Sequence, residues 1–510
     1  MSAIAKTFFA NADSTPEKLA LWCDGRTMTY SQLADFVRRW SCLMVSRGVR
    51  RGDHVAVLLP NGIEFVALML VAADLGVVLV PLNTSLPASA VDRAFEASDV
   101  RHVVGTKDTL ADLVPSAAGD FGSAEGIWLS VDGELPGVGC LSGLLAEVRS
   151  CDSPDLGAEG DDPFILTMTS GSTGDPKPII LTQRTKLNRA HAAVELYGIT
   201  ASHRTLAATP LYHSLAERLV LIPLLTGGTS VLMTRFSPSE WLRCAAEQSV
   251  SFTIAVSSQL RQIAQHLTDA GQGQLGSLRC VVSSSALLET EVKAELIAKL
   301  RCEFHECYGA SEIAIASNLD PQAAKTKLKS VGRAAPGVDI AILREGDMVA
   351  ASGEAGEIAC RTPMLFGGYF RRPDLTAETM WGEYFRTGDV GMLDKDGFLY
   401  FLGRKKDIVV TGGINVYPAD VESVVAEHAS VQECAAFPLP DARLGEIVAI
   451  AVVPQHPSSF DPRGVRFLCA ERLADFQQPR RYFVVDELPK NSLGKVMKHA
   501  LIERLSGAEA

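Results

Sequence analysis

The 11 cysteines of this 510-residue chain include no C-x-x-C pair and are scattered singly along the sequence. An odd number of cysteines without regular spacing does not form the disulfide framework of a small secreted domain. We therefore expect reduced, mostly buried thiols and a cytoplasmic protein. The chain is also too long for one compact core, which predicts about two to four domains.

A basic surface is missing as well. The chain has 48 Lys and Arg against 60 Asp and Glu, a net charge of −12, whereas a protein that binds nucleic acid or an anionic membrane needs a basic face. The most apolar stretch, residues 54–82, is interrupted by Pro60, Asn61, Glu64 and Asp74, so it is too polar for a membrane span. The sequence therefore predicts no nucleic-acid partner and no integral membrane segment.

One stretch that is present is rich in small polar residues. Thr169 to Pro178 reads Thr-Ser-Gly-Ser-Thr-Gly-Asp-Pro-Lys-Pro and follows a short apolar run typical of a buried strand. Its glycines let backbone amides approach a ligand, and its hydroxyls and Lys177 add donors and a positive charge, which suits a polyphosphate. It is not a P-loop, because Gly171 and Gly174 are too close together and proline follows the lysine. A flexible surface loop is the alternative.

Strand and helix signals alternate between residues 28 and 104, and again between residues 179 and 285. This alternation predicts two doubly wound α/β subdomains with parallel sheets. From Val331 onward, short β-like runs are separated by glycine-rich turns, which predict a small antiparallel β-barrel or sandwich. The last hundred or so residues have the mixed pattern of a small α+β domain.

Several later stretches offer further ligand chemistry. Tyr308 to Glu312 places an aromatic ring and a carboxylate on one turn, and Arg386 to Asp389 presents an aspartate that could accept hydrogen bonds from ribose hydroxyls. Arg404 adds a cation, and the segment 488–495 ends in Lys495. Each is weak alone, because such tyrosines are commonly core residues, such aspartates turn residues and such lysines solvated.

In this order and at these spacings, the stretches resemble the adenylate-forming superfamily, which includes acyl- and aryl-CoA synthetases, the adenylation domains of nonribosomal peptide synthetases, and luciferases. The resemblance covers nearly the whole chain. It implies a large N-terminal AMP-binding region at 1–403 and a small mobile domain at 404–510. It also implies ATP-dependent activation of a small-molecule carboxylic acid as acyl-AMP, with release of pyrophosphate, and then transfer to coenzyme A.

The resemblance also implies the roles of individual residues. Mg²⁺ would be held by Glu312 and Thr173, Asp389 and Arg404 would hold the ribose, and Lys495 would bridge the substrate carboxylate and the α-phosphate. The implied phosphate loop consists of Thr169, Ser170, Gly171, Ser172, Thr173, Gly174 and Lys177. The implied adenine site consists of Tyr308, stacked on the base, with Ser284, Ser285, Ala286, Glu306, Cys307, Gly309, Ala310 and Ser311 around it.

For the second half-reaction, the resemblance implies that the small domain rotates about a hinge at Lys406 and withdraws Lys495. Thr411, Gly412 and Gly413 would then line a tunnel for the pantetheine arm of coenzyme A, where glycines leave room beside the backbone. The predicted catalytic residues are Lys495, Glu312, Thr173 and His213.

The identity of the acid is left open between aryl, alkyl and dicarboxylic acids. Relatives that activate amino acids place an aspartate near Tyr212, and none is present here. Glu217 and Arg218 are unusual on an apolar segment, and they could pair with each other or with the barrel, or Arg218 could meet a second polar group of the substrate. The pocket candidates are His213, which could equally be a core histidine, together with Ser214, Ser283, Ser285, Cys307 and Gly309.

Three positions depart from the pattern of the superfamily. Pro178 replaces a glycine and stiffens the exit of the loop, Ser311 replaces a threonine, and Ile414 replaces a glutamate found in many members. None removes a catalytic group. The alternative functions are an acyl-AMP ligase that passes its adenylate to a carrier protein or a partner enzyme, and a non-catalytic nucleotide-binding protein. A homodimer is also left open.

Overall fold

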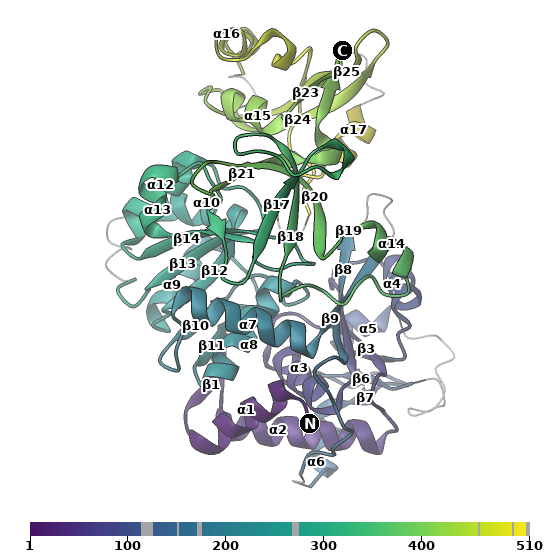
Figure 1. Cartoon of the computed structure of the whole chain (residues 1–510). Helices are drawn as coiled ribbons and strands as arrows, with labels where there is room; N and C mark the ends of the chain where they lie inside the picture. Colours follow the sequence, from purple (N-terminus) through teal and green to yellow (C-terminus); the bar gives the residue numbers. More distant parts are fainter. Residues whose placement is uncertain are drawn as a thin grey trace.

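The computed structural model describes residues 1–113, 126–149, 152–170, 176–267, 275–456, 460–491 and 494–505. Four sheets organise these residues, two of them mainly parallel and two mainly antiparallel. The predicted α/β class is confirmed. Figure 1 shows the two large α/β units in the lower part of the molecule and the C-terminal unit above them.

The first sheet has seven strands in the order β7-β6-β5-β3-β4-β8-β9, and all neighbours are parallel except the last pair. β8 and β9 form a hairpin in which Thr169 is paired with Lys177, so the small polar stretch connects these two strands. The strands are β3 (His54–Leu58), β4 (Val78–Pro81), β5 (His102–Gly105), β6 (Trp128–Ser130), β7 (Gly139–Cys140), β8 (Pro163–Ser170) and β9 (Pro176–Thr182).

The second sheet has nine strands in the order β16-β15-β14-β13-β12-β10-β11-β1-β2, with a parallel centre from β14 to β1. The carboxyl ends of β13 and β14 carry Ser284 and Tyr308. The strands are β1 (Leu19–Cys23), β2 (Arg26–Thr29), β10 (Arg204–Ala207), β11 (Thr229–Leu232), β12 (Phe252–Val256), β13 (Cys280–Ser284), β14 (Glu303–Tyr308), β15 (Ser317–Leu319) and β16 (Arg333–Ala334).

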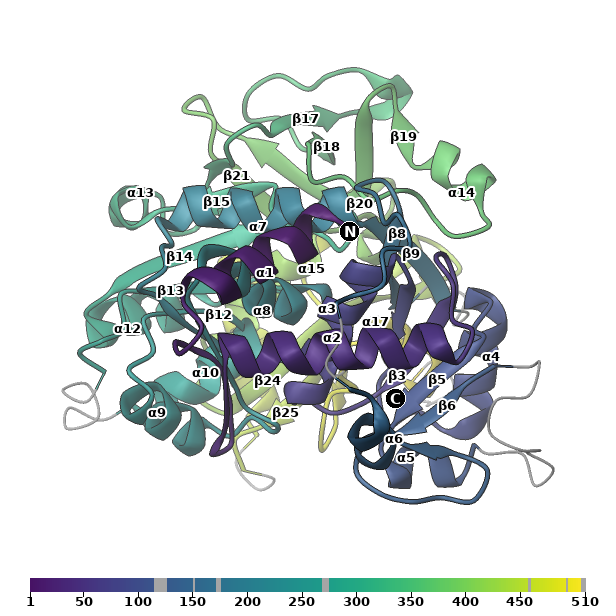
Figure 2. The ribbon, with the colours of Figure 1, turned by 90° about the horizontal axis from the view of Figure 1, so that it is seen from below.

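Five helices of the large region pack against one another, and α1 and α2 lie nearest the viewer in Figure 2. The five are α1 (Ala3–Ser14), α2 (Tyr30–Ser46), α3 (Ile63–Leu75), α7 (Gln183–Tyr197) and α8 (Ser214–Thr226). Every residue of α3 except Glu64 is buried, which is why its sequence is apolar on all sides. Thr29 caps α2 with a capping box.

The remaining helices of the large region lie on the outer faces of the sheets or in the connections. They are α4 (Ala88–Ser98), α5 (Lys107–Ala111), α6 (Leu141–Glu147), α9 (Pro238–Glu247), α10 (Ser257–His266), α12 (Thr290–Leu300), α13 (Pro321–Lys327) and α14 (Pro373–Glu378).

The third sheet takes the place of the predicted barrel. It is an open antiparallel sheet in the order β17-β18-β20-β19, with β21 paired to β20, so the expected β-barrel is present as a half-barrel. Asp389 on β20 is paired directly with Arg404 on β21. The strands are β17 (Asp339–Leu343), β18 (Gly356–Arg361), β19 (Met380–Trp381), β20 (Tyr384–Leu393) and β21 (Leu399–Arg404).

The C-terminal unit is built on the fourth sheet, in the order β23-β22-β25-β24, with β26 paired to β25. A short 3₁₀ turn at Lys405–Asp407 connects it to β21. Its strands are β22 (Val409–Thr411), β23 (Ile414–Val416), β24 (Val431–Asp441), β25 (Gly445–Pro454) and β26 (Arg481–Val484), and its helices are α15 (Pro418–Ala426), α16 (Pro462–Arg472) and α17 (Lys498–Leu505).

The structure bears on two expectations from the sequence, the absence of a membrane span and the reduced cysteines. None of the helices in the described ranges is long and apolar enough to cross a membrane. Nine described cysteines are free and most are buried, as expected, but Cys42 is disulfide-bonded. The expectation of reduced thiols throughout is therefore wrong at that position.

Candidate active site

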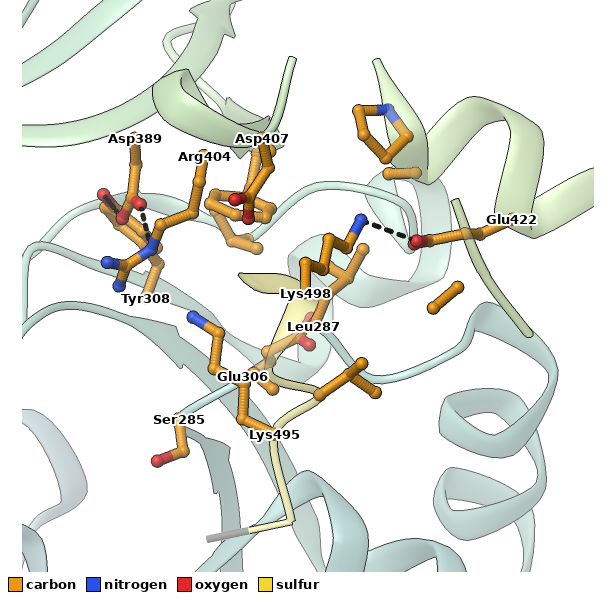
Figure 3. A pocket seen from close by; sticks show the side chains of 18 of the residues that line it. Ser285, Leu287, Glu306, Tyr308, Asp389, Arg404, Asp407, Glu422, Lys495 and Lys498 are labelled. Carbon is orange, nitrogen blue, oxygen red and sulfur yellow. Dashed lines mark hydrogen bonds and ion pairs between the residues drawn. The ribbon is translucent and has the colours of Figure 1, made fainter. Parts of the chain in front are cut away.

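A cavity of about 220 Å³ lies between the large region and the C-terminal unit. The segment after β13, the ends of β14 and β21, α15 and the loop before α17 all contribute to its wall. Figure 3 shows Tyr308, Asp389, Arg404 and Lys495 directed toward one space from these different elements. Four stretches that are far apart in the sequence therefore meet at one site.

Asp389 is the centre of a hydrogen-bonded group in this cavity. The Tyr308 hydroxyl donates to Asp389 Oδ2 at 2.8 Å, and Arg404 Nε lies 3.0 Å from Asp389 Oδ1. Asp389 is only 4% exposed. Burial raises the pKa of its carboxyl, while Arg404, Tyr308 and Lys495 act in the opposite direction. The surrounding cations therefore favour a carboxylate that can accept further hydrogen bonds.

Lys495 supplies a cation from the C-terminal unit. Its loop is closed by the Asn491 side chain, whose Oδ1 accepts from the backbone N–H of Lys495 at 2.9 Å. Burial and the nearby Arg404 lower the pKa of Lys495 to about 8, although Asp389 and Asp407 partly offset this shift. Lys495 has no ion pair with any residue in the described ranges. The ammonium is thus placed to receive an anion.

Two backbone features shape the wall beside Tyr308. A Cβ on Gly309 would lie 1.7 Å from the carbonyl oxygen of Ala314, so only glycine allows the turn after β14 to close this tightly. Ser285 adopts φ +83°, a left-handed conformation that costs about 1–3 kcal/mol for a residue with a side chain. Both residues line the cavity, so the strained backbone occurs where a ligand would sit.

Family models match both parts of the chain. The model for AMP-binding enzymes matches residues 8–370, and the model for the C-terminal domain of these enzymes matches residues 420–495. The chain belongs to the AMP-binding enzyme family. The cavity described above lies between the two matched parts.

The relatives of this AMP-binding enzyme match nearly its whole length. Long-chain-fatty-acid–CoA ligase FadD13 of Mycobacterium tuberculosis is 29% identical, and the alignment covers 94% of this chain and 93% of that protein. The o-succinylbenzoate–CoA synthetase of Bacillus subtilis, solved with its acyl-adenylate intermediate, has a TM-score of 0.85 and 27% identity over 97% of each chain. The amide bond synthetase McbA of Marinactinospora thermotolerans has a TM-score of 0.87 and 27% identity, covering 98% of this chain and 100% of that one.

Glu312 lies on the turn after Tyr308 in the AMP-binding enzyme but is not a residue of the cavity wall. The Tyr369 hydroxyl donates to Glu312 Oε1 at 3.1 Å, and Arg189 Nη2 donates to the Glu312 carbonyl at 2.9 Å. Burial raises the pKa of the Glu312 carboxyl. Arg189 therefore fixes the backbone of Glu312, while the Tyr369 hydroxyl donates to its carboxylate.

The predicted phosphate loop is described only at its ends. Gly171, Ser172, Thr173 and Gly174 lie outside the described residues, and Thr169 and Ser170 are described by their backbone alone. The exit of the loop has a structural explanation. Pro178 lies on β9, the edge strand of its sheet, and its carbonyl accepts from the Phe370 backbone N–H at 2.9 Å. Proline is compatible with an edge strand because no ladder hydrogen bond is lost there.

The other predicted adenine and acyl residues divide into two groups. The members that line the cavity are Ser285, Ala286, Glu306, Cys307 and Gly309; those that do not are His213, Ser214, Ser283, Ser284, Ala310 and Ser311. The Glu306 carboxylate forms a buried ion pair with Lys293 and accepts from the Leu288 backbone N–H, so both of its oxygens already have partners. His213 precedes α8, and burial lowers its pKa to about 4.

The predicted residues for the second half-reaction lie apart from the cavity. Lys406 is exposed on the 3₁₀ turn that precedes the fourth sheet, and Thr411 ends β22. Gly412 and Gly413 form the exposed turn between β22 and β23, at φ +56° and +82°. None of these residues lines the cavity.

Sequence reasoning missed other residues of the wall. Asp407 and Phe401 line the cavity, and the Phe401 ring lies 5.9 Å from the Tyr308 ring between centroids. Lys498 and Glu422 also line it and form an ion pair at 2.7 Å. Asp407 could have been found as a carboxylate three positions after Arg404, but the other positions carry no sequence signal for this site.

Proposed function

We propose that this AMP-binding enzyme is an ATP-dependent carboxylic acid–CoA ligase. The observation that carries the proposal is the position of Lys495, which enters the same cavity as Tyr308, Asp389 and Arg404 although it comes from the C-terminal unit. That position brings a cation against the place where a nucleotide held by Tyr308 and Asp389 would carry its α-phosphate. Full-length relatives that are CoA ligases support this function.

In the first step, an oxygen of the substrate carboxylate attacks the α-phosphorus of ATP, and the bond from that phosphorus to the pyrophosphate oxygen breaks. Acyl-AMP and pyrophosphate are the products. Asp389 accepts hydrogen bonds from the ribose, the Tyr308 ring lies against adenine, and Lys495 donates to both the carboxylate and the α-phosphate. A buried cation placed where negative charge develops stabilises the transition state more than it would in water.

The residues present fit a magnesium ion beside the phosphates. Glu312 is a half-buried carboxylate with a raised pKa that accepts a hydrogen bond from the Tyr369 hydroxyl. A poorly solvated anion of this kind is stabilised by a hard divalent cation. We propose that Glu312 and Thr173, which lies outside the described residues, hold this ion. When bound, Mg²⁺ neutralises charge on the phosphate oxygens.

In the second step, the sulfur of coenzyme A attacks the acyl carbon, the bond to the AMP oxygen breaks, and the thiol proton leaves to solvent. We propose that residues 404–510 move as one domain about a hinge at Lys406 and withdraw Lys495. The exposed Gly412–Gly413 turn then approaches the site and lines the path of the pantetheine arm. Such a rotation lets one cavity serve two reactions.

A second candidate acceptor has support from the comparison with the amide bond synthetase. In that case the acyl-AMP is passed to a carrier protein or another nucleophile rather than to free coenzyme A. A cytoplasmic location and a homodimer stay predictions from the sequence.

Acid-dependent release of pyrophosphate tests the proposed function. The purified chain is incubated with ATP, Mg²⁺ and a panel of aryl, alkyl and dicarboxylic acids, with and without coenzyme A, and products are identified by mass spectrometry. We expect an acid that releases pyrophosphate and yields acyl-CoA when coenzyme A is present. Asp389→Asn is the matched control, expected to weaken ATP binding. Acyl-AMP without thioester would favour the alternative acceptor, and no acid-dependent release would refute both.

A further inference from the structure

An unbalanced group of charges is buried between α7 and α8. Lys186 and Arg189 on α7 and Arg218 on α8 are at most 6% exposed, and Glu217 beside them is fully buried. Lys186 Nζ lies 2.5 Å from Glu217 Oε2, so one oxygen of the only carboxylate on α8 in this group is already paired. Glu217 Oε1 is buried and has no hydrogen-bond partner among the described residues. The prediction that Glu217 pairs with Arg218 or with the barrel is thus replaced by a pair with Lys186.

Arg218 is left without an acidic partner. Its Nη1 is buried and has no hydrogen-bond partner in the described part of the chain, and no ion pair there involves its guanidinium. Arg189 does not compensate, because its guanidinium donates to the carbonyls of Met364 and Glu312 and to a hydroxyl. A buried guanidinium that lacks a partner is destabilising, so its presence calls for an anion that binds there.

The surroundings of Arg218 connect it to the candidate active site. Ser214 and Arg218 are four residues apart and therefore lie on one face of α8. Arg189 joins this face to the metal-site turn, since it donates to Ser214 Oγ at 3.3 Å and to the Glu312 carbonyl at 2.9 Å. On its other side, Arg218 is close enough to Cys307, a residue of the cavity wall, to oppose the rise of its thiol pKa.

We infer that Arg218 binds a second carboxylate of the acid substrate, which makes that substrate a dicarboxylic acid. This inference rests on the proposed function, because the first carboxylate must be the one that attacks ATP beside Lys495. A planar guanidinium suits a carboxylate, since its N–H groups can donate in parallel to both oxygens. Glu217 and Glu312 are the carboxylates that face the group, and the former is held by Lys186 while the latter is the metal-site residue.

Matched pairs of acids test the inference on the full-length enzyme. Pyrophosphate release is measured with unbranched dicarboxylic acids from malonate to suberate, each against the monocarboxylic acid of the same carbon number. For the best chain length, we expect kcat/KM for the diacid to exceed that of the monoacid on the order of 100-fold, as for a buried charge pair. Equal or better use of the monoacids would overturn the inference while leaving the ligase function intact.

Arg218→Met separates a substrate contact from a structural role. We expect the diacid to lose on the order of 100-fold in kcat/KM, mainly through KM, while the monoacid keeps its rate. Arg184→Met is the control, because Arg184 is exposed and its one ion pair among the described residues is with Asp161. The diacid preference of this variant should equal that of the wild type. An equal loss for both acids in the Arg218 variant would show that the residue is structural only.

Thermal shift gives a readout that does not depend on turnover. Because a buried charge without a partner is removed, Arg218→Met should melt at or above the wild-type temperature in the absence of ligand. The stabilisation by a diacid should be lost, and that by ATP retained. If this variant does not fold, Arg218→Lys should still lower the diacid-to-monoacid ratio about tenfold, because the parallel donors are lost; an unchanged ratio would overturn the inference. Absence of pyrophosphate release with every acid would instead refute the proposed function.

Discussion

The interior of the large region holds a fully buried lysine, Lys186, and the cavity below the C-terminal unit holds a partly buried one, Lys495. Burial lowers the pKa of both to about 8. Their partners differ. Lys186 has a carboxylate oxygen of Glu217 at 2.5 Å, whereas the charge closest in effect to Lys495 is the like charge of Arg404. The first lysine is paired within the protein, whereas Asp389 and Asp407 compensate the second only in part, so an anion that enters the cavity can complete the compensation.

This difference separates a structural ion pair from a binding site. Two opposite charges in a poorly solvated interior attract strongly, but the attraction mainly repays the cost of desolvation. A cation that lies beside another cation and has no ion pair of its own gains most of that attraction from a ligand, so the energy is available for binding and catalysis. A pKa of about 8 alone would not distinguish the two lysines, and the geometry of their neighbours does.

Removal of Lys186 should have the largest effect, and it should lower the stability of the protein. Lys186→Met leaves the Glu217 carboxylate buried without a partner, so we expect a loss of about 3–5 kcal/mol in the free energy of unfolding. The measurement is urea denaturation followed by circular dichroism.

The double variant Lys186→Met/Glu217→Leu is the control for that experiment. Because it removes both charges, we expect it to recover most of the lost stability. A double variant as unstable as the single one would mean that the ion pair itself, and not the orphaned carboxylate, determines the stability of this region.

The position of Lys495 should depend on how closely its loop packs against α10. Gly494 has φ +75°, and a Cβ there would lie 2.5 Å from Ser258 Oγ on α10. We expect Gly494→Ala to move the loop away from the large region and to slow acyl-AMP formation by about tenfold or more, as for roughly 1–3 kcal/mol of strain. The second half-reaction, measured as thioester formation from supplied acyl-AMP, should be nearly unchanged.

Gly346→Ala is the matched control. Gly346 has φ +74° and no atom within 4 Å of an added Cβ, so it carries similar backbone strain in a place without a docking surface. If this control slowed acyl-AMP formation as much as Gly494→Ala, the effect would be general strain rather than loss of docking.

The residues of the cavity could largely be predicted from the sequence, because each ligand motif is local. Tyr308, Asp389, Arg404 and Lys495 each lie in a short segment with its own pattern, and the structure brings all four to one cavity. The alternation of strands and helices likewise predicts the two α/β subdomains.

What could not be predicted depends on contacts between distant segments. The pairing of Glu217 with Lys186 joins two helices across 31 residues of sequence, and no local pattern distinguishes it from a pair with the neighbouring Arg218. The contribution of Glu422 and Lys498 to the cavity depends on how the C-terminal unit docks. The half-barrel differs from the predicted barrel because closure requires a pairing between edge strands that glycine-rich turns do not specify.

The smallest expected effect is on the pH dependence of catalysis. Lys495 must be protonated to attract a carboxylate and a phosphate, and its lowered pKa of about 8 means that it is charged below that pH and neutral above it. We expect kcat/KM for pyrophosphate release to be flat below about pH 8 and to fall by up to about tenfold per pH unit above it. Because a guanidinium stays protonated throughout this range, Lys495→Arg should remove the fall, whatever rate remains.

The central claim is that Lys495, in the arrangement described here, serves the formation of acyl-AMP and not its use. The most direct measurement compares the two half-reactions of Lys495→Ala, as pyrophosphate release from ATP and acid and as thioester formation from supplied acyl-AMP and coenzyme A. Loss of the cation should slow the first by about 10²–10³-fold and leave the second nearly unchanged. An equal loss in both half-reactions would contradict the account.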